Sequence, residues 1–163
     1  YASARGLVGF DVSSPNFGLA EQVDNPWGPG CVSLSGPKEA DARAWYAKTN
    51  TAIFAYSSIG RGFFSGRITR ENYKDTADGA CAKAYCHEVN FKRLDRAREL
   101  AAQKNLSVAQ VALAYVLNQP LNVFALVGAA NADEIRANDA ASEVKLSAEE
   151  LAWLNLERES VEA

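Results

Sequence analysis

The residues best suited to binding a phosphate group follow an apolar stretch near the middle of the chain. "AIFAY" (52–56) is followed by "SSIGRG", which supplies the hydroxyls of Ser57 and Ser58, the small Gly60 and the cationic Arg61. Hydroxyls and exposed backbone amides donate hydrogen bonds to phosphate oxygens, and an arginine adds a charge-assisted contact. A tight turn beside a solvated arginine would use the same residue types, so this stretch alone leaves both interpretations open.

Small polar residues recur at the ends of the other apolar runs. Ser13 and Ser14 follow the first run, Ser35 and Gly36 the second, and Gly128 the last. Ligands of parallel sheets and barrels bind at the carboxyl ends of the strands, where loop amides and helix N-termini point outward. Four such ends in one chain favour a ligand site over four unrelated turns.

Cys81, Cys86 and His87 in "CAKAYCH" form a second cluster of chemically active residues. Their spacing is loose for a zinc site and no second pair of ligands follows, so we expect no metal here. His87 is expected to be solvated or hydrogen-bonded rather than catalytic. The chain has three cysteines, an odd number that indicates reduced thiols and a cytoplasmic protein.

These residues require a framework in which strands alternate with helices. Four β-branched or aromatic runs predict parallel strands at 6–14, 31–36, 51–58 and 123–128. Amphipathic patterns predict helices in the connections, and capping signatures mark three of their starts, at Ser107 with Gln110, Asn131 with Glu134 and Ser147 with Glu150. The chain is therefore predicted to be an α/β domain of the form (β/α)4, in which the long connection 67–89 folds partly over the strand ends.

The composition excludes several classes of partner. The chain has 163 residues, a formal net charge of -3 and 48% apolar residues, as one ordinary globular domain would. Lysine and arginine are scattered, so no basic surface for nucleic acid is predicted. No apolar run approaches the roughly 18 residues of a membrane span.

Four motifs, in the correct order, resemble the C-terminal half of the aldo-keto reductases. "VSSPNF" (12–17) is similar to the family's V-S-N-F after the fifth strand, with two residues inserted, and "AYSSIGRGFFSG" (55–66) is similar to its A-Y-S-P-L-G-x-G-x-L-x-G after the seventh. "SVAQVALAYVLNQP" (107–120) resembles the family helix A-Q-V-A-L-x-W-x-L-x-Q, and "VGAANADEIRAN" (127–138) its G-x-x-x-x-x-x-x-x-E-N stretch. The resemblance implies half of a TIM-type (β/α)8 barrel that binds NADP(H) across its strand ends and reduces carbonyl compounds.

The resemblance also implies a role for individual residues. Ser14 and Asn16 would hold the nicotinamide carboxamide, and Asn138 the adenine edge. Gly128 would form the turn near the adenosine phosphate. The pyrophosphate would be lined by Ser57, Ser58, Ile59 and Gly60, with Arg61 beside them.

The sequence departs from the family pattern where phosphate selectivity is made. Many relatives have a lysine or arginine and a serine around positions 128, 129 and 134, whereas this chain has Gly128, Ala129 and Glu134. We interpret Glu134 as a helix cap. Arg136 is then the nearest cation for a 2′-phosphate, and NAD(H) is not excluded as the cofactor.

The catalytic Asp, Tyr, Lys and His of the family lie on the first half of the barrel, outside these residues. We therefore expect the chain alone to be inactive and to be either a fragment or a half-barrel that needs a partner, namely the N-terminal half or a second copy of itself. A small-molecule carbonyl substrate would belong to the complete protein. Two alternatives remain open: a non-catalytic binding or regulatory module, and a phosphate-binding half-barrel of another enzyme.

Overall fold

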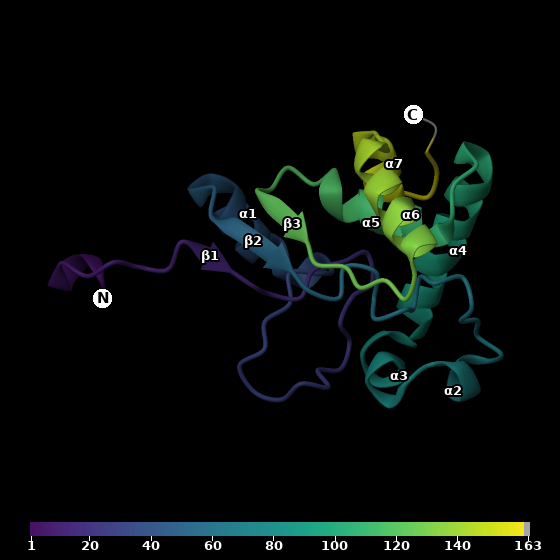
Figure 1. Ribbon diagram of the computed structural model, residues 1–163, viewed down its shortest axis with the longest axis horizontal. Coiled ribbons are helices and arrows are strands. Elements are labelled where there is room, and N and C mark those ends of the chain that lie inside the picture. The colour runs from purple at the N-terminus through teal and green to yellow at the C-terminus, as the bar shows by residue number, and fades with distance from the viewer. Residues whose placement is uncertain (162–163) are drawn as a thin grey trace.

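Three short parallel strands form the sheet of this protein. In the computed structural model, which describes residues 1–161, β1 (Val12–Ser13), β2 (Ala52–Ala55) and β3 (Val123–Ala125) lie in the order β1-β2-β3. Val12 pairs with Ala52, and Ile53 pairs with Val123. The predicted α/β class and the partial TIM-type barrel are confirmed (Figure 1).

The strand predicted at 31–36 does not form, which corrects the expected number of strands from four to three. β1 pairs directly with β2, so no place remains between them for another strand. The segment instead runs parallel to the residues that follow β1, where Asn16 donates its backbone N–H to Val32 O (2.9 Å) and its carbonyl accepts that of Leu34 (2.7 Å). An isolated bridge between Asn16 and Ser33 is the remnant of the expected pairing.

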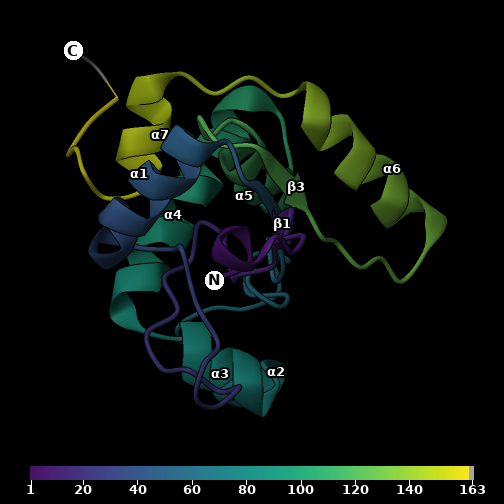
Figure 2. The ribbon, with the colours of Figure 1, turned by 90° about the vertical axis from the view of Figure 1, so that its left-hand side faces the viewer.

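The helices lie mainly on one side of the sheet and carry the core (Figures 1 and 2). Their bounds are α1 Ala40–Thr49, α2 Tyr73–Thr76, α3 Gly79–Tyr85, α4 Glu88–Lys104, α5 Val108–Leu117, α6 Ala132–Ala140 and α7 Ala148–Leu154. Short 3₁₀ turns occur at Ser3–Arg5, Pro37–Glu39 and Ala141–Glu143. Helix α5 is buried along most of its length, as its nearly continuous apolar sequence requires, whereas α6 stands out from the body and buries no residue (Figure 2).

The helix starts follow the predicted caps. Ser107 and Ser147 each begin a complete capping box, with the third helical residue, Gln110 or Glu150, bonding back to the backbone of the cap. Asn131 accepts the N–H of Glu134 at 2.9 Å, but the Glu134 carboxylate accepts from Ala130 N (2.8 Å) rather than from Asn131. The cap by Asn131 is therefore confirmed, but the predicted capping box is not complete, because Glu134 bonds the residue before the cap.

The long connection between β2 and α4 folds beneath the strand ends, as predicted. It contains α2 and α3, which lie together at the bottom of Figure 1. Two buried contacts attach α3 to the sheet: Tyr85 Oη accepts from Asn16 Nδ2 at 2.9 Å, and Cys81 Sγ lies 3.7 Å from Gly60 O. Both partners, Asn16 and Gly60, belong to loops that follow strands.

The face of the sheet away from the helices is open. Ile53 and Ala55 are fully buried against the helices, but Phe54 between them is 40% exposed. Phe124 of the neighbouring strand is 53% exposed and meets Phe54 edge to face, with ring centroids 5.4 Å apart. Within residues 1–161, no strand pairs with the outer edges of β1 and β3.

Candidate functional site

The carboxyl ends of all three strands meet at one edge of the sheet because the strands are parallel. Ser14 follows β1, the turn 56–62 follows β2, and Gly128 lies in the segment that follows β3. Ser35 and Gly36, which were expected at a fourth strand end, follow no strand. The edge separates into a groove and a smaller cavity.

The groove lies between the turn after β2, the start of α5 and helix α6, and has a volume of about 350 Å³. It brings together Ile59, Gly128 and Asn138, which the sequence placed along one cofactor from three distant segments. The other lining residues are Gly62, Ser65, Arg67, Ser107, Ala109, Glu134 and Ala137. Gly128 leaves the groove open, because no atom lies within 4 Å of the position that a Cβ would occupy.

Arg67 is a cation of this groove that sequence reasoning missed. It lies five residues after the expected turn, at the end of "FFSGR" (63–67). Arg67 directly follows the last residue of the motif 55–66, so extending that motif by one residue would have included it. Among the residues described by the structure, Arg67 forms no ion pair. Arg136, which the sequence offered for this role, is not in the groove lining and instead pairs with Asp133 at 2.7 Å on the exposed side of α6.

The turn after β2 has an unusual backbone. Ser57 and Arg61 have φ values of 55° and 52°, in the left-handed region that residues other than glycine rarely adopt. Gly60 (φ 64°) shares it, and a Cβ there would lie 3.1 Å from Phe63 Cβ. Ser58 is buried and donates its hydroxyl to Ala55 O at 2.9 Å, so this hydroxyl shapes the turn.

Arg61 points away from the groove. Its Nε donates to both carboxylate oxygens of Asp78, at 3.0 and 2.9 Å, and its guanidinium lies over the Trp27 ring, 5.1 Å from the centroid. Arg61 does not line the groove. In this structure, therefore, the guanidinium is paired with a carboxylate of the protein.

Ser14 and Asn16 lie apart from the groove. Ser14 lines a separate cavity of about 270 Å³ with Tyr46, Tyr56 and Cys31, and its hydroxyl donates to Phe54 O at 2.8 Å. Asn16 is buried at 1% exposure and its side-chain amide is used within the protein: Nδ2 donates to Tyr85 Oη and Tyr56 O, and Oδ1 accepts from Ser33 Oγ.

Comparison with known proteins identifies the fold family. A sequence model described as the aldo/keto reductase family matches residues 35–155. The chain belongs to the aldo/keto reductase family. It is also 30% identical, over 125 residues, to versiconal hemiacetal acetate reductase of Aspergillus parasiticus, a match that covers 74% of this chain and 36% of the relative. The chain thus spans about a third of the length of this reductase.

The family match contains the whole groove, from Ile59 to Asn138, and three of the four motifs that carried the resemblance. The first motif, "VSSPNF" (12–17), lies before it. In residues 1–161, no helix is both long and apolar enough to cross a membrane.

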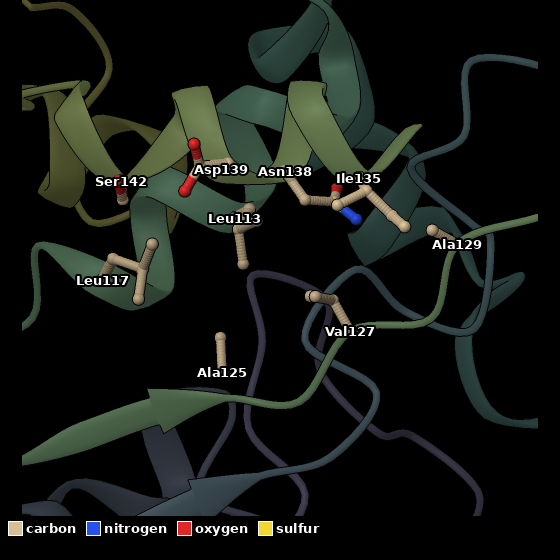
Figure 3. A pocket seen from close by; sticks show the side chains of 9 residues that line it. All are labelled: Leu113, Leu117, Ala125, Val127, Ala129, Ile135, Asn138, Asp139 and Ser142. Carbon is tan, nitrogen blue, oxygen red and sulfur yellow. The ribbon is translucent and has the colours of Figure 1, made fainter. Parts of the chain in front are cut away.

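A second, apolar groove of about 490 Å³ separates α6 from β3 in this aldo/keto reductase chain (Figure 3). Figure 3 shows Leu113 and Leu117 of α5 facing Ala125 and Val127 across the opening, with Ile135 of α6 above. This groove lies beside the unpaired edge of β3. Its lining is mainly apolar, and Asn138, Asp139 and Ser142 are its polar members.

Cys81 lies in α3, and Cys86 and His87 connect α3 to α4. His87 is the residue before α4, and its Nε2 lies 2.7 Å from Lys83 O, so it is hydrogen-bonded as expected. Cys81 and Cys86 are buried thiols, and Cys31 is exposed. No cluster of three metal-binding side chains occurs in the part of the chain that the structure describes.

Proposed function

We propose that this chain is the cofactor-binding half of an NADP(H)-dependent carbonyl oxidoreductase. The observation that carries the proposal is the groove of about 350 Å³ in which Ile59, Gly128 and Asn138 meet, because the family resemblance assigns all three to one dinucleotide. Family membership supports the reductase class. Bound NADPH would supply the hydride that reduces a small-molecule carbonyl compound.

The residues of this chain would bind and orient the cofactor. The backbone around Gly62 and Gly128 can approach phosphate oxygens, since these two glycines have no atom within 4 Å of the position that a Cβ would occupy. Asn138 offers a side-chain amide at the far end of the groove. Ser14 and Tyr56, in the smaller cavity after β1 and β2, would face the nicotinamide end.

Arg67 favours NADP(H) over NAD(H) in this proposal. Arg67 lines the groove and forms no ion pair among the described residues, whereas the Glu134 carboxylate accepts a hydrogen bond from Ala130 N. An arginine matches the geometry of a phosphate group, and a hydrogen bond to a charged group contributes about 1.5–3 kcal/mol.

Calorimetric titration of the chain with NADPH and NADH tests the cofactor assignment. Arg67→Ala should weaken NADPH binding by about 10- to 100-fold. Arg136→Ala is the matched control, because Arg136 is an exposed arginine outside the groove, and its affinity should equal that of the parent. Failure of the parent chain to bind either dinucleotide would contradict the proposed function.

We further propose that the N-terminal half of a reductase barrel covers the open side of the sheet. Phe54 and Phe124, which are 40% and 53% exposed, present the apolar surface that such a half would bury. The longer relative supports a partner half, and a second copy of this chain is the alternative arrangement. Light scattering at micromolar concentration should show self-association of the isolated chain, and a stable monomer that binds no apolar dye would contradict the proposal.

The chain alone should not turn over carbonyl substrates. The family's proton-donating group is assigned to the other half, and general acid catalysis contributes a factor of about 10² to 10⁴. An assay with NADPH and a panel of aldehydes tests this expectation. Cofactor binding without turnover would also describe a regulatory module, so restored turnover on adding the N-terminal half distinguishes the enzyme.

The free thiols Cys31, Cys81 and Cys86 fit a reducing compartment such as the cytoplasm.

A further inference from the structure

The turn 57–62 is held in a conformation that its sequence alone does not favour. Two of its residues other than glycine, Ser57 and Arg61, have positive φ values, and Gly60 and Gly62 also lie in this region. Backbone strain of this kind persists only where the surrounding structure fixes it, and it concentrates at functional sites. The contacts of Arg61 are therefore expected to hold the turn in this conformation.

Arg61 is anchored from two sides. Its Nε donates to both oxygens of Asp78 (3.0 and 2.9 Å), and its guanidinium stacks on Trp27, in the loop after β1. Each contact joins the turn to a segment distant in sequence. The ion pair is half exposed, with side-chain exposures of 44% for Arg61 and 51% for Asp78, so it is sensitive to salt.

Asp78 is itself fixed in place. Its Oδ1 accepts from the backbone N–H groups of Ala80 and Cys81, both at 2.9 Å, and caps the start of α3. Burial acts to raise the pKa of Asp78, but the hydrogen bonds from Cys81 N and Arg61 outweigh burial and hold the pKa below its usual value. The carboxylate is thus charged at neutral pH and attached to a helix rather than to a mobile loop.

The two sides of the turn have different neighbours. Ile59 and Gly62 line the groove, whereas the Arg61 side chain lies against Asp78 and Trp27. The contacts that hold the Arg61 side chain therefore also fix the backbone of the neighbouring residues, which line the groove. The cation on the groove itself is Arg67.

We propose that Arg61 and Asp78 are positioning residues, whose ion pair holds the turn 57–62 in the shape that receives the dinucleotide, without either side chain touching it. The inference rests on the proposed function, because the groove must bind a dinucleotide for the turn to need this shape. It replaces the expectation that Arg61 contacts the pyrophosphate. The positioning role and the phosphate-contact role predict different effects on dinucleotide affinity when the charge of Asp78 is removed.

A double-mutant cycle separates them. Arg61→Gln and Asp78→Asn each remove one charge, and asparagine remains a good helix cap, so α3 keeps its start. Each variant should weaken NADPH binding about 3- to 10-fold in calorimetry, and the double variant should be no weaker than the poorer single variant. If Arg61 instead contacted phosphate, Asp78→Asn would leave the affinity unchanged or increase it, and that result would overturn the proposal.

Hydrogen–deuterium exchange gives a readout that needs no ligand. The hydrogen-bonded amides of the turn are those of Gly60, Phe63 and Phe64, which donate to Ser57 O, Gly60 O and Ile59 O. These amides should exchange faster in Arg61→Gln and in Asp78→Asn than in the parent, and Arg61→Lys should restore part of the protection. The pair Arg136 and Asp133, an exposed ion pair on α6, provides matched controls: Arg136→Gln and Asp133→Asn should change neither measurement. Unchanged exchange in the turn would overturn the proposal even if dinucleotide binding is observed. If the parent binds no dinucleotide, the proposed function fails, while the exchange experiment still decides whether the pair fixes the turn.

Discussion

Asn16 and Tyr85 are joined by a buried hydrogen bond of 2.9 Å between Asn16 Nδ2 and Tyr85 Oη, although 69 residues separate them. Asn16 follows β1, and Tyr85 ends α3 in the long connection. Burial raises the pKa of Tyr85, and its hydrogen bonds to Ser57 and Asn16 act in the opposite direction. One phenol therefore ties the loop after β1, the turn after β2 and α3 together behind the groove.

Loss of this phenol should destabilise the chain. Tyr85→Phe is expected to lower the free energy of unfolding by about 0.5–1.5 kcal/mol, because it removes the hydroxyl and leaves the buried Asn16 amide with fewer partners. Urea denaturation measures the change. Tyr73→Phe is the control, since the Tyr73 hydroxyl makes no hydrogen bond within residues 1–161. An equal effect of both substitutions would show that the connection to Asn16 contributes nothing.

Two neighbouring residues of β2 should respond differently to truncation. Ile53 is fully buried against the helices, and Ile53→Ala should cost about 2–5 kcal/mol in the isolated chain. Phe54 is 40% exposed on the open face, so Phe54→Ala should cost much less stability but should weaken association with a partner. Denaturation and light scattering measure the two effects. A large loss of stability with unchanged association for Phe54→Ala would mean that this face is not an interface.

Tyr115 should make stability depend on alkaline pH. Burial raises its pKa to about 12, so the folded chain holds this proton more tightly than the unfolded chain does. The stabilisation is complete below the unfolded pKa of about 10 and is lost as the pH rises through about 12. Tyr115→Phe should remove a slope of up to about 1.4 kcal/mol per pH unit in this interval. Identical pH profiles for parent and variant would refute a shifted phenol.

The two capping boxes allow a comparison of stability with ligand binding. Ser107→Ala and Ser147→Ala should each cost about 1 kcal/mol, because each removes the acceptor of an N-terminal amide. Only Ser107 lines the groove. In thermal denaturation with added NADPH, the stabilisation by ligand should therefore be smaller for Ser107→Ala than for Ser147→Ala. The same ligand-induced shift in both variants would remove Ser107 from the site.

The sequence predicted the parts of the fold that depend on local chemistry. Helix starts at Ser107, Asn131 and Ser147 were predictable because capping involves residues three positions apart. The strand at 31–36 was wrongly predicted because its composition suits a strand, while the direct pairing of β1 with β2 is a property of the whole sheet. The candidate site was likewise predictable where it depends on local motifs, and not where it depends on residues distant in sequence. Gly128 and Asn138 reach the groove as the motif implied, but the direction of Arg61 depends on Asp78, which lies 17 residues further along and bears no motif.

The central claim, that this aldo/keto reductase chain binds a nicotinamide dinucleotide in the groove after β2 and β3, is tested most directly by nuclear magnetic resonance. Titration of the ¹⁵N-labelled chain with NADPH should shift the amide signals of Ile59, Gly62, Gly128 and Asn138, which line the groove. The amides of α7, Ala148–Leu154, lie outside it and should stay in place. Saturable shifts confined to the groove are the expected result. An unchanged spectrum at millimolar NADPH, or shifts that cluster away from these residues, would contradict the account.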